Sequence, residues 1–295
     1  MRKKHRSAAA GKEKYLFVLP LVIFILVMAI YPIGYIAKLS FYEWSLALGQ
    51  SPKWAGMENY VYALTSQSFW HSVWITLIYA VVSVLVEVVL GVCLALLLAK
   101  NFKAKNLVKT GFILPMVATP VAIALTWRLM YDVNYGIINY LLGKLGLQFM
   151  GISSAETALI SFIMVDIWQW TPFIMLMVSA GIASLPTDPY EAAMLDGATK
   201  GQILGRITLP LLNPTILTAT LLRLIDALKS FDIIYATTKG GPGDSSKTLN
   251  ILVYEEAFSN FRFGRVSAYV VLFVVFILLV CGVFMKIKKR VEVDF

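Results

Sequence analysis

Two apolar stretches of the chain carry polar side chains at helical spacing. One stretch places four residues at i, i+3, i+4 and i+7, and these are Asp166, Gln169, Trp170 and Phe173. The other has Arg223, Asp226, Ala227 and Ser230 at matching positions, with Lys229 at the edge of the set. Residues with these spacings share one face of a helix. Each stretch therefore predicts a helix with a polar stripe.

The two stripes suit a ligand rich in hydroxyl groups. Carboxylates and guanidinium groups hydrogen-bond hydroxyls in a forked geometry, and an aromatic ring packs on the apolar face of a pyranose. A second interpretation stays open, in which Arg223 pairs with Asp226 or Asp166 and the ion pairs hold helices together. Under either interpretation these side chains make their contacts inside an apolar protein, where a charged group without a partner is costly.

Other reactive side chains are sparse. The only histidines, His5 and His71, do not combine with other residues into a metal site or a catalytic triad. Cys93 and Cys281 lie inside apolar runs, which indicates two core cysteines and no disulfide. We therefore predict a protein that is not an enzyme and holds no metal.

Two further charged residues lie in apolar stretches. We assign Glu87 to helix packing or to a subunit contact. Arg128 lies near the end of its stretch, where a long basic side chain can extend to the lipid headgroups.

The segment GPGDSSKT, from Gly241 to Thr248, differs by one residue from a phosphate-binding loop, because Ser246 replaces the second glycine. Such a loop also needs a preceding strand and a following helix to direct backbone amides at phosphate. An apolar segment precedes this one. We predict no ATP site here, but a turn at the outer mouth formed by Gly240, Gly241 and Pro242.

The composition indicates an all-α membrane protein. Of 295 residues, 59% are hydrophobic and 15% are charged, whereas soluble domains hold about 25% charged residues. The mean hydropathy is +0.74. Six stretches reach the roughly 20 residues that a helix needs to cross hydrocarbon. They run approximately over residues 15–37, 72–99, 108–131, 157–184, 214–237 and 266–285.

The distribution of basic residues gives the orientation. With a cytoplasmic N-terminus, the inner segments hold sixteen Lys and Arg and the outer segments hold seven. Inner loops of membrane proteins are enriched in these residues, so both termini are expected in the cytoplasm. The net charge of +9 then reflects topology and not nucleic-acid binding. The first apolar run is too long for a signal peptide, and we predict an uncleaved first span.

Two of the predicted outer segments, 56–70 and 251–261, have aromatic residues at helical spacing. In the second segment Tyr254, Phe258 and Phe261 share one face. This pattern predicts short helices that lie at the membrane interface.

A polar segment, 186–214, separates the fourth and fifth predicted spans on the cytoplasmic side. Asp188 and Glu191 have the spacing of a capping box, with Pro189 at the first helical position. The helix is expected to run to Asp196, where Gly197 suits the left-handed residue that ends a helix.

A second helix is expected to follow at once. Thr199 and Gln202 form another capping box, and this helix should end near Ile207, before Pro210 and Pro214. The segment thus predicts helix, turn, helix. Its small apolar face suits docking of another protein and consists of Ala192, Ala193, Leu195, Ile203 and Leu204.

This segment resembles the EAA loop of permeases of binding-protein-dependent ABC importers. The matching residues are Glu191-Ala192-Ala193, Asp196-Gly197-Ala198, Ile207-x-Leu209-Pro210 and the preceding Leu185-Pro186. In that family the loop forms a coupling helix that sits in a cleft of the ATPase subunit. The resemblance implies an ATPase contact for Glu191, Ala192, Ala193, Asp196, Gly197, Ile207, Leu209 and Pro210. The residue types alone also allow purely local roles, in which Glu191 caps its helix and Gly197 turns the chain.

Further motifs are similar to the carbohydrate-uptake branch of the family, which includes maltose and glycerol-phosphate permeases. They are Gly56-x-x-Asn59-Tyr60 followed by Phe69-Trp70, and Thr238-x-Gly240-Gly241-Pro242. The match covers essentially residues 15–285, and the two polar stripes look like the sugar-lining helices of maltose-type permeases. Residues 202–206 lack the aromatic often present there, which leaves the detailed fit to the ATPase open.

The resemblance implies the type I ABC importer permease fold. It has a six-helix transmembrane domain over residues 15–285, with the coupling loop at 186–212 and cytoplasmic basic tails at 1–14 and 286–295. The implied partners are a second, related permease subunit, a cytoplasmic ATPase dimer that binds ATP and Mg²⁺, and an extracytoplasmic solute-binding protein. This chain itself is expected to bind no cofactor and no nucleic acid. We expect it among the lipids of a bacterial or archaeal inner membrane.

The expected function is uptake of sugars, with oligosaccharides favoured, by alternating access. A glycerol phosphate or polyol cargo would use the same machinery. An ion- or proton-coupled secondary transporter would instead use Asp166, Asp226 and Arg223 and would give Glu191 and Gly197 no role. A membrane scaffold would not need polar stripes. The sequence identifies neither the sugar nor the partner ATPase.

Overall fold

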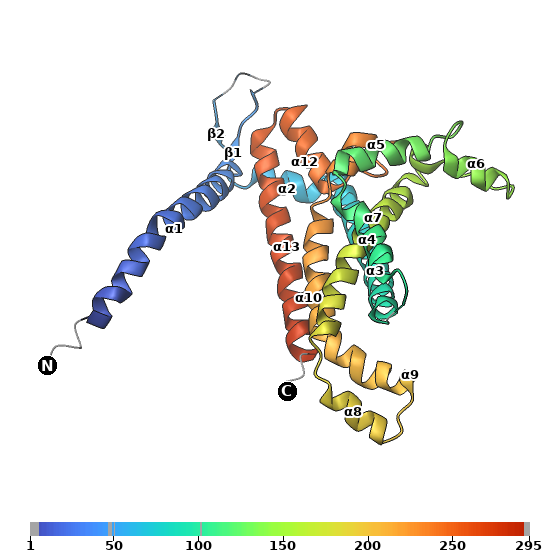
Figure 1. Cartoon of the computed structure of the whole chain (residues 1–295). Helices are drawn as coiled ribbons and strands as arrows, with labels where there is room; N and C mark the ends of the chain where they lie inside the picture. Colours follow the sequence, from blue (N-terminus) through green and yellow to red (C-terminus); the bar gives the residue numbers. More distant parts are fainter. Residues whose placement is uncertain (1–5, 47–48, 50, 101, 292–295) are drawn as a thin grey trace. The chain divides into compact units, whose positions relative to one another are not determined.

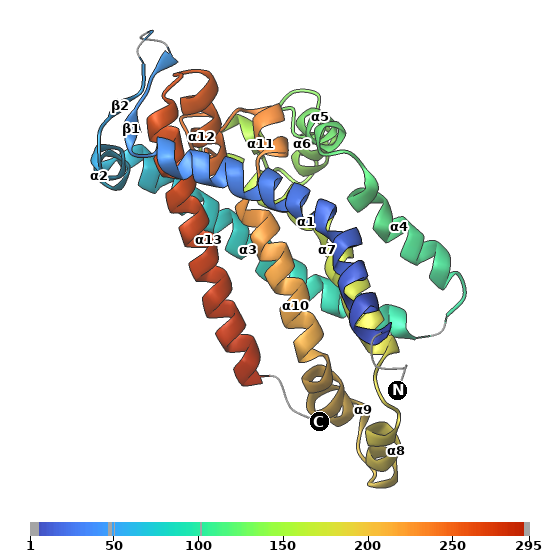
Figure 2. The same ribbon diagram turned by 90° about the vertical axis from the view of Figure 1, so that its left-hand side faces the viewer.

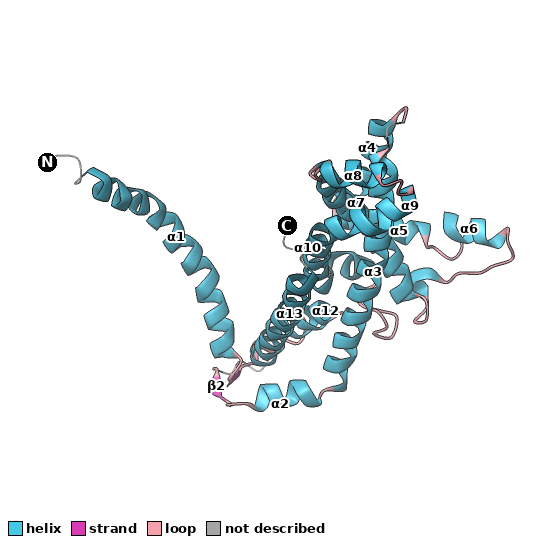
Figure 3. Cartoon of the chain, turned by 90° about the horizontal axis from the view of Figure 1, so that it is seen from below, coloured by secondary structure: helices cyan, strands magenta, loops and turns pink. Residues whose placement is uncertain are grey.

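The computed structural model describes residues 6–46, 49, 51–100 and 102–291, with side chains from Phe17 to Lys289 within them. Helices dominate this part of the chain (Figure 3), and its one strand pair joins β1 (Tyr42–Glu43) to β2 (Lys53–Trp54) in antiparallel register. The chain forms two compact units. One contains residues up to Ser66 together with Val253–Val274, and the other contains Gln67–Leu252 and the last helix from Val275 onward.

The prediction of an all-α membrane protein is confirmed. Among the described residues, five helices are long and apolar enough to cross a membrane, and one bent pair makes a possible sixth span. The five are built on α1 (Arg6–Leu39), α3 (Gln67–Ala99), α7 (Ala158–Ala183), α10 (Leu209–Leu228) and α13 (Phe263–Val291), as labelled in Figure 1.

The third predicted span, 108–131, is not one straight helix. It consists of α4 (Lys105–Val117) and α5 (Pro120–Met130), which meet at 97° (Figure 2). Ala118 and Thr119 are extended, with ψ of 144° and 140°. Proline disfavours a helical conformation in the residue before it and lacks the amide hydrogen that a continuing helix needs. The prediction of a single helix was wrong because Pro120 falls inside the apolar run.

The fifth span also departs from its predicted bounds of 214–237. The backbone is helical from α9 (Lys200–Ile203) through a π-helical turn (Leu204–Thr208) into α10. Pro210 and Pro214 therefore do not end a helix, and that prediction was wrong. The π-helical turn widens the backbone at Arg206, four residues before Pro210, where an α-helical carbonyl would meet the proline ring.

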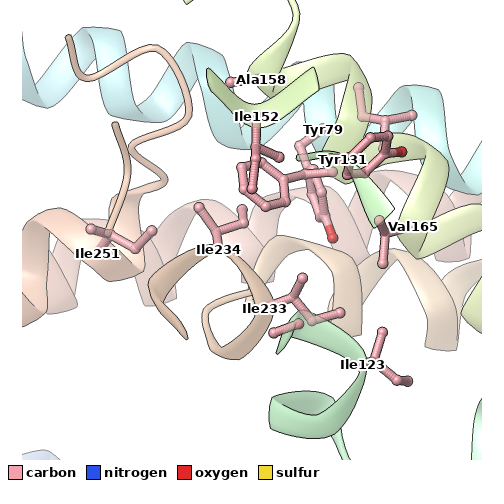
Figure 4. Close-up of a cluster of buried hydrophobic side chains, with 12 residues drawn as sticks. Tyr79, Ile123, Tyr131, Ile152, Ala158, Val165, Ile233, Ile234 and Ile251 are labelled. Atoms are coloured by element: carbon pink, nitrogen blue, oxygen red, sulfur yellow. The ribbon is translucent and has the colours of Figure 1, made fainter. Parts of the chain in front are cut away.

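At its other end this span is interrupted. α10 ends at Leu228, and a short helix, α11 (Asp232–Thr237), begins after residues 229–231. α11 packs against α5. One buried cluster holds these elements to α3 and α7 and includes Tyr79, Ile123, Phe162, Val165, Ile233 and Ile234 (Figure 4). The interruption at 229–231 is thus fixed on its α11 side by apolar packing.

The outer segments form short helices, with two corrections to the predicted ones. α2 (Glu58–Thr65) covers only part of 56–70, because α3 already begins at Gln67 and includes the following aromatic pair. α12 (Leu249–Phe258) brings the rings of Tyr254 and Phe258 to a 4.8 Å centroid separation. Phe261 lies beyond this helix with a positive φ of 53°, so it does not share the predicted face. The remaining short helices are α6 (Ile137–Gly143) and a 3-10 turn (Gly151–Ser153).

The motif around Asn59 has a structural explanation. The Asn59 amide donates to the carbonyls of Ser40 and Tyr42, each at 2.9 Å. The Tyr60 hydroxyl lies 2.7 Å from the hydroxyl of Ser40. These contacts tie α2 to the end of α1 and to β1.

Helices α3, α7 and α10 pack against one another through small residues, as is common between membrane helices. A Cβ atom on Gly91 of α3 would lie 2.6 Å from Cβ of Ile174 on α7. A Cβ atom on Gly181 of α7 would lie 3.0 Å from Thr215 on α10. Glycine at these positions therefore sets how closely the helices approach.

We predict that Gly91→Ala lowers the thermal unfolding midpoint of the detergent-solubilised protein, because overpacking costs about 1–3 kcal/mol. Gly282→Ala is the matched control, since nothing lies within 4 Å of its added Cβ. Alanine favours either helix by about 1 kcal/mol over glycine, so the comparison isolates the clash. Equal midpoints for the two variants would contradict close packing at Gly91.

Candidate functional site

A buried guanidinium group joins three membrane helices. Arg223 of α10 is 2% exposed. Its Nε lies 2.8 Å from one carboxylate oxygen of Glu87 on α3, and its Nη2 lies 3.1 Å from the other. Nη2 also pairs with Asp166 of α7. The arginine therefore links α10 to both neighbouring helices.

Two more contacts complete the surroundings of Arg223. Nη1 lies 3.5 Å from Asp226, one turn further along α10. The guanidinium carbon lies 5.1 Å from the ring centre of Trp170, which is within range of a cation–π contact. The ion pairs of Arg223 with Asp166 and with Asp226 are thus both present.

The pairing of Arg223 with Glu87 could not be predicted from the sequence. The carboxylate of Glu87 is fully buried, in keeping with the assignment to helix packing. In the sequence, Glu87 stands alone among apolar residues of the 67–99 stretch. The residues around Glu87 therefore do not indicate a partner 136 positions away in the sequence. The only sequence signal is the cost of a carboxylate at membrane depth, which demands some cation.

A cavity of about 170 Å³ adjoins this cluster at the interruption after α10. Six predicted path residues line it, namely Asp166, Gln169, Trp170, Arg223, Asp226 and Ser230. Phe173 is not among the lining residues and packs in the apolar cluster around Ile174 and Met175 instead. The cavity is also lined by residues that the periodicity did not select, namely Pro120, Lys229, Phe231, Asp232 and Ile233. All of these lie at or beyond a helix break, where a helical period no longer applies.

Two polar side chains at the cavity, Ser230 and Gln169, differ in their hydrogen bonding. The Ser230 hydroxyl donates to the hydroxyl of Tyr79 at 3.2 Å. Gln169 is 1% exposed, and its side-chain oxygen has no hydrogen-bond partner in the structure. An unpaired buried amide oxygen costs free energy. This oxygen is itself buried, so the cavity does not present it to a ligand even though Gln169 lines the cavity.

The glycine-rich segment after α11 is a compact turn. Gly240 has a φ of +94°, and its Cβ would lie 3.1 Å from Cα of Lys247. The ammonium of Lys247 pairs with Asp244 at 2.8 Å, and the Ser246 amide donates back to the Gly240 carbonyl. α11, and not a strand, precedes this segment. The geometry is that of a turn rather than of a phosphate-binding loop.

This turn is attached to the neighbouring elements. Thr248 donates to the carbonyl of Ser230 at 3.3 Å, and the amide of Leu249 donates to Thr76 at 2.9 Å. The ring of His71 lies 3.0 Å from the Asp244 carbonyl. The predicted outer-mouth turn, with Gly240, Gly241 and Pro242, is therefore anchored at the same interruption that borders the cavity.

The polar segment that connects the C-terminal end of α7 to the N-terminal end of α10 forms a hairpin (Figure 1). This hairpin contains α8 (Asp188–Leu195) and α9. Gly197 has a φ of +73°, as predicted for the end of α8. The capping box of Thr199 and Gln202 is present. The predicted capping box at Asp188 is wrong, because Thr187 precedes the first helical residue and makes no side-chain cap.

The hairpin exposes apolar side chains at its tip. Leu195 is 89% exposed, and Met194 and Leu204 are exposed as well. Half of the predicted coupling residues are exposed, namely Glu191, Ala192, Asp196 and Gly197, and the other half are half-buried, namely Ala193, Ile207, Leu209 and Pro210. The hydroxyl of Tyr190 donates to Thr208 at 3.1 Å and joins the two arms. This gives a defined surface with exposed apolar groups, as expected of a protein contact.

The other compact unit has a polar pocket of about 420 Å³ that sequence analysis did not predict. Its walls come from three separate segments, and the lining residues are Glu43, Trp44, Ser45, Glu58, Asn59, Tyr62, Asn260, Arg262 and Arg265. The Arg265 guanidinium lies 3.9 Å from the ring centre of Tyr62. Within the described residues, no group of three or more His, Cys, Asp and Glu side chains has the arrangement of a metal site.

Comparison with known proteins places this geometry in a family. The model of the binding-protein-dependent transport system inner membrane component matches residues 87–293. The trehalose/maltose transport system permease protein MalF of Thermococcus litoralis is 34% identical, with 97% of this chain and 96% of that protein covered. The sulfoquinovosyl glycerol transport system permease protein SmoG of Agrobacterium fabrum is 32% identical, with 93% and 89% covered.

A solved structure of a bacterial ABC transporter involved in import of the acidic polysaccharide alginate has the same fold. The TM-score is 0.83 over 98% of this chain and 99% of that one, at 23% identity. The family match spans the Arg223 cluster, the cavity and the hairpin. The chain therefore belongs to the family of binding-protein-dependent transport system inner membrane components, the membrane-spanning permease subunits of ABC importers.

Proposed function

We propose that this chain takes up sugars, with oligosaccharides favoured, from a solute-binding protein and moves them by alternating access. The observation that carries the proposal is the small polar cavity next to Arg223, inside a helix bundle that is otherwise apolar. Its carboxylates, amide, hydroxyl and aromatic ring are the groups that hydrogen-bond and stack on sugars. Relatives named for trehalose, maltose and sulfoquinovosyl glycerol support a sugar cargo.

The hairpin is the proposed contact with a separate ATPase subunit. α9, the π-helical turn and α10 are continuous from Lys200 to Leu228. A displacement of the hairpin is therefore carried along α10 to Arg223 and Asp226. This chain would not hydrolyse ATP, which with Mg²⁺ would bind to the partner ATPase dimer. The N- and C-termini and the hairpin would all lie in the cytoplasm, as the basic residues indicate.

Two further partners complete the proposal. A second, related permease subunit would face this chain across the translocation path, and the solute-binding protein would dock on the outer loops, with the Gly240–Pro242 turn among its contacts. The contact with a binding protein is supported by a solved structure of the same fold, a bacterial alginate ABC transporter in complex with an alginate pentasaccharide-bound periplasmic protein.

An ion-coupled transporter is less well supported. Arg223 already occupies Asp166 and Glu87 with direct ion pairs. Asp226, whose side chain is half exposed, has the longest of these ion pairs, at 3.5 Å. The exposed hairpin would also have no role in such a transporter.

The proposed function predicts uptake that depends on ATP. Vesicles that contain both permeases and the ATPase should accumulate labelled sugar only when the binding protein and ATP are supplied together. Uptake that continues without ATP, or that follows an imposed ion gradient, would overturn the importer.

We predict that Gly197→Ala lowers ATP-driven uptake several-fold while the complex still assembles. Alanine in the left-handed conformation costs about 1–2 kcal/mol, so the turn between α8 and α9 should shift. Gly201→Ala is the control, because this helical glycine has open space around it and no positive φ. Uptake and assembly are measured on the same preparations, and equal uptake by the two variants would remove the case for a defined turn in coupling.

We predict that Arg223→Met strongly lowers the unfolding midpoint, because it leaves two buried carboxylates unpaired, a change that costs about 3–5 kcal/mol. Arg128→Met, at an exposed arginine of α5, serves as the control. Adding Glu87→Leu and Asp166→Leu to Arg223→Met should restore much of the stability. A midpoint for Arg223→Met that equals the control would show that these ion pairs do not hold the helices.

A further inference from the structure

We infer that the cavity at the α10–α11 interruption selects neutral, hydroxyl-rich cargo and disfavours anionic cargo, with Asp226 and Asp232 as the residues that set this preference. The inference rests on the proposed function and narrows its substrate class. Both neutral and anionic cargo need to be considered, because relatives are named for uncharged disaccharides and for a sulfonated sugar.

The first observation is the charge of the lining. Three carboxylates line the cavity, on Asp166, Asp226 and Asp232, against two cations, on Arg223 and Lys229. The charged side chains of the lining therefore carry one negative charge in excess, and Glu87 is a further carboxylate directly behind Arg223. An anion placed among them is repelled, although solvent weakens the repulsion at Asp226 and Asp232, which are exposed.

The second observation is that the strongest anion-binding group is already engaged. Both forked edges of the Arg223 guanidinium meet carboxylates, and its face lies against Trp170. A phosphate or carboxylate ligand would have to displace Glu87 or Asp166 and leave it buried without a partner. That exchange is unfavourable. Lys229 is the one remaining lining cation, and its side chain is exposed at the edge.

The third observation concerns hydrogen-bond polarity. The carboxylates of Asp226 and Asp232, which line the cavity, are acceptors only. These groups need donors. A sugar hydroxyl can donate and accept, whereas an ionised phosphate, sulfonate or carboxylate accepts only.

The partial charges at the helix ends beside the cavity do not reverse the preference for neutral cargo. The C-terminal end of α10 brings partial negative charge, and the N-terminal end of α5 brings partial positive charge of similar size. α5 begins with Pro120, which has no amide hydrogen to offer an anion. α11 begins with Asp232, so the first turn of this helix already carries a negative charge. The charges of the side chains therefore determine the preference between neutral and anionic cargo.

The test uses the assembled complex of both permeases and the ATPase in lipid nanodiscs, without the binding protein. The probes are maltose, trehalose and trehalose 6-phosphate, and binding is followed by quenching of tryptophan fluorescence, because Trp170 lines the cavity. We expect at least one neutral disaccharide to bind about tenfold more tightly than the phosphate, which corresponds to about 1.4 kcal/mol.

Variants separate the local charges from the net charge of the protein. In Asp226→Asn with Asp232→Asn, the ratio of neutral to phosphorylated affinity should fall to about threefold or less. Lys229→Gln should increase the ratio. Glu156→Gln removes an exposed carboxylate outside the cavity lining and should leave the ratio unchanged.

Three results would overturn the inference. They are tighter or equal binding of the phosphate, an unchanged ratio in the double variant, and no binding of any probe. Failure of the proposed function is distinguished by the vesicle assay, in which sugar uptake would no longer require ATP. An importer that remains ATP-driven but binds the phosphate better would refute only the charge preference.

Discussion

The guanidinium of Arg223 is buried among α3, α7 and α10, and it must be paired with carboxylates there. An uncompensated charge at this depth is costly, and Glu87, Asp166 and Asp226 meet it from three directions. Because these partners lie on α3, α7 and α10, one side chain fixes the relative position of three helices. The small residues Gly91 and Gly181 make the same approach possible sterically. Ion pairing and close packing therefore specify a single arrangement at this level of the bundle.

The cavity exists because regular helix stops beside that constraint. α10 ends at Leu228 just beyond the ion pairs, and α5 begins at Pro120 after a sharp bend. Both interruptions face the same small volume. Broken helices at membrane depth are tolerated where they line a polar cavity or are buried in protein. The packing of α11 against α5 and around Tyr79 supplies that burial on the outer side (Figure 4).

Local patterns in the sequence predicted which residues share a helix face. They could not predict which distant residues pair with one another. Helical spacing correctly grouped Asp166, Gln169 and Trp170, and likewise Arg223, Asp226 and Ser230, on the cavity. Phe173 satisfied the same spacing but lies a turn too far along α7. Glu87 could not be matched to Arg223, since no local pattern encodes a contact across 136 residues. The predicted helix bounds failed at two prolines, because Pro120 bends an apolar run that was predicted as one helix and Pro210, predicted to end a helix, lies within a continuous one. In both cases the outcome depends on the conformation of the preceding turn, which composition does not reveal.

The two regions of interest are connected by one helix. The hairpin continues through the π-helical turn into α10, and α10 ends at the cavity. The Arg223 ion pairs tie this helix to α3 and α7 close to its outer end. In the proposed transport cycle, a movement of the hairpin that preserved those ion pairs would turn α10 about Arg223 and would not pull it away from its neighbours. Asp226, Lys229 and Ser230 lie just beyond that point, so they would move in relation to Gln169 and Trp170 on α7. The same ion pairs would then determine which wall of the cavity moves.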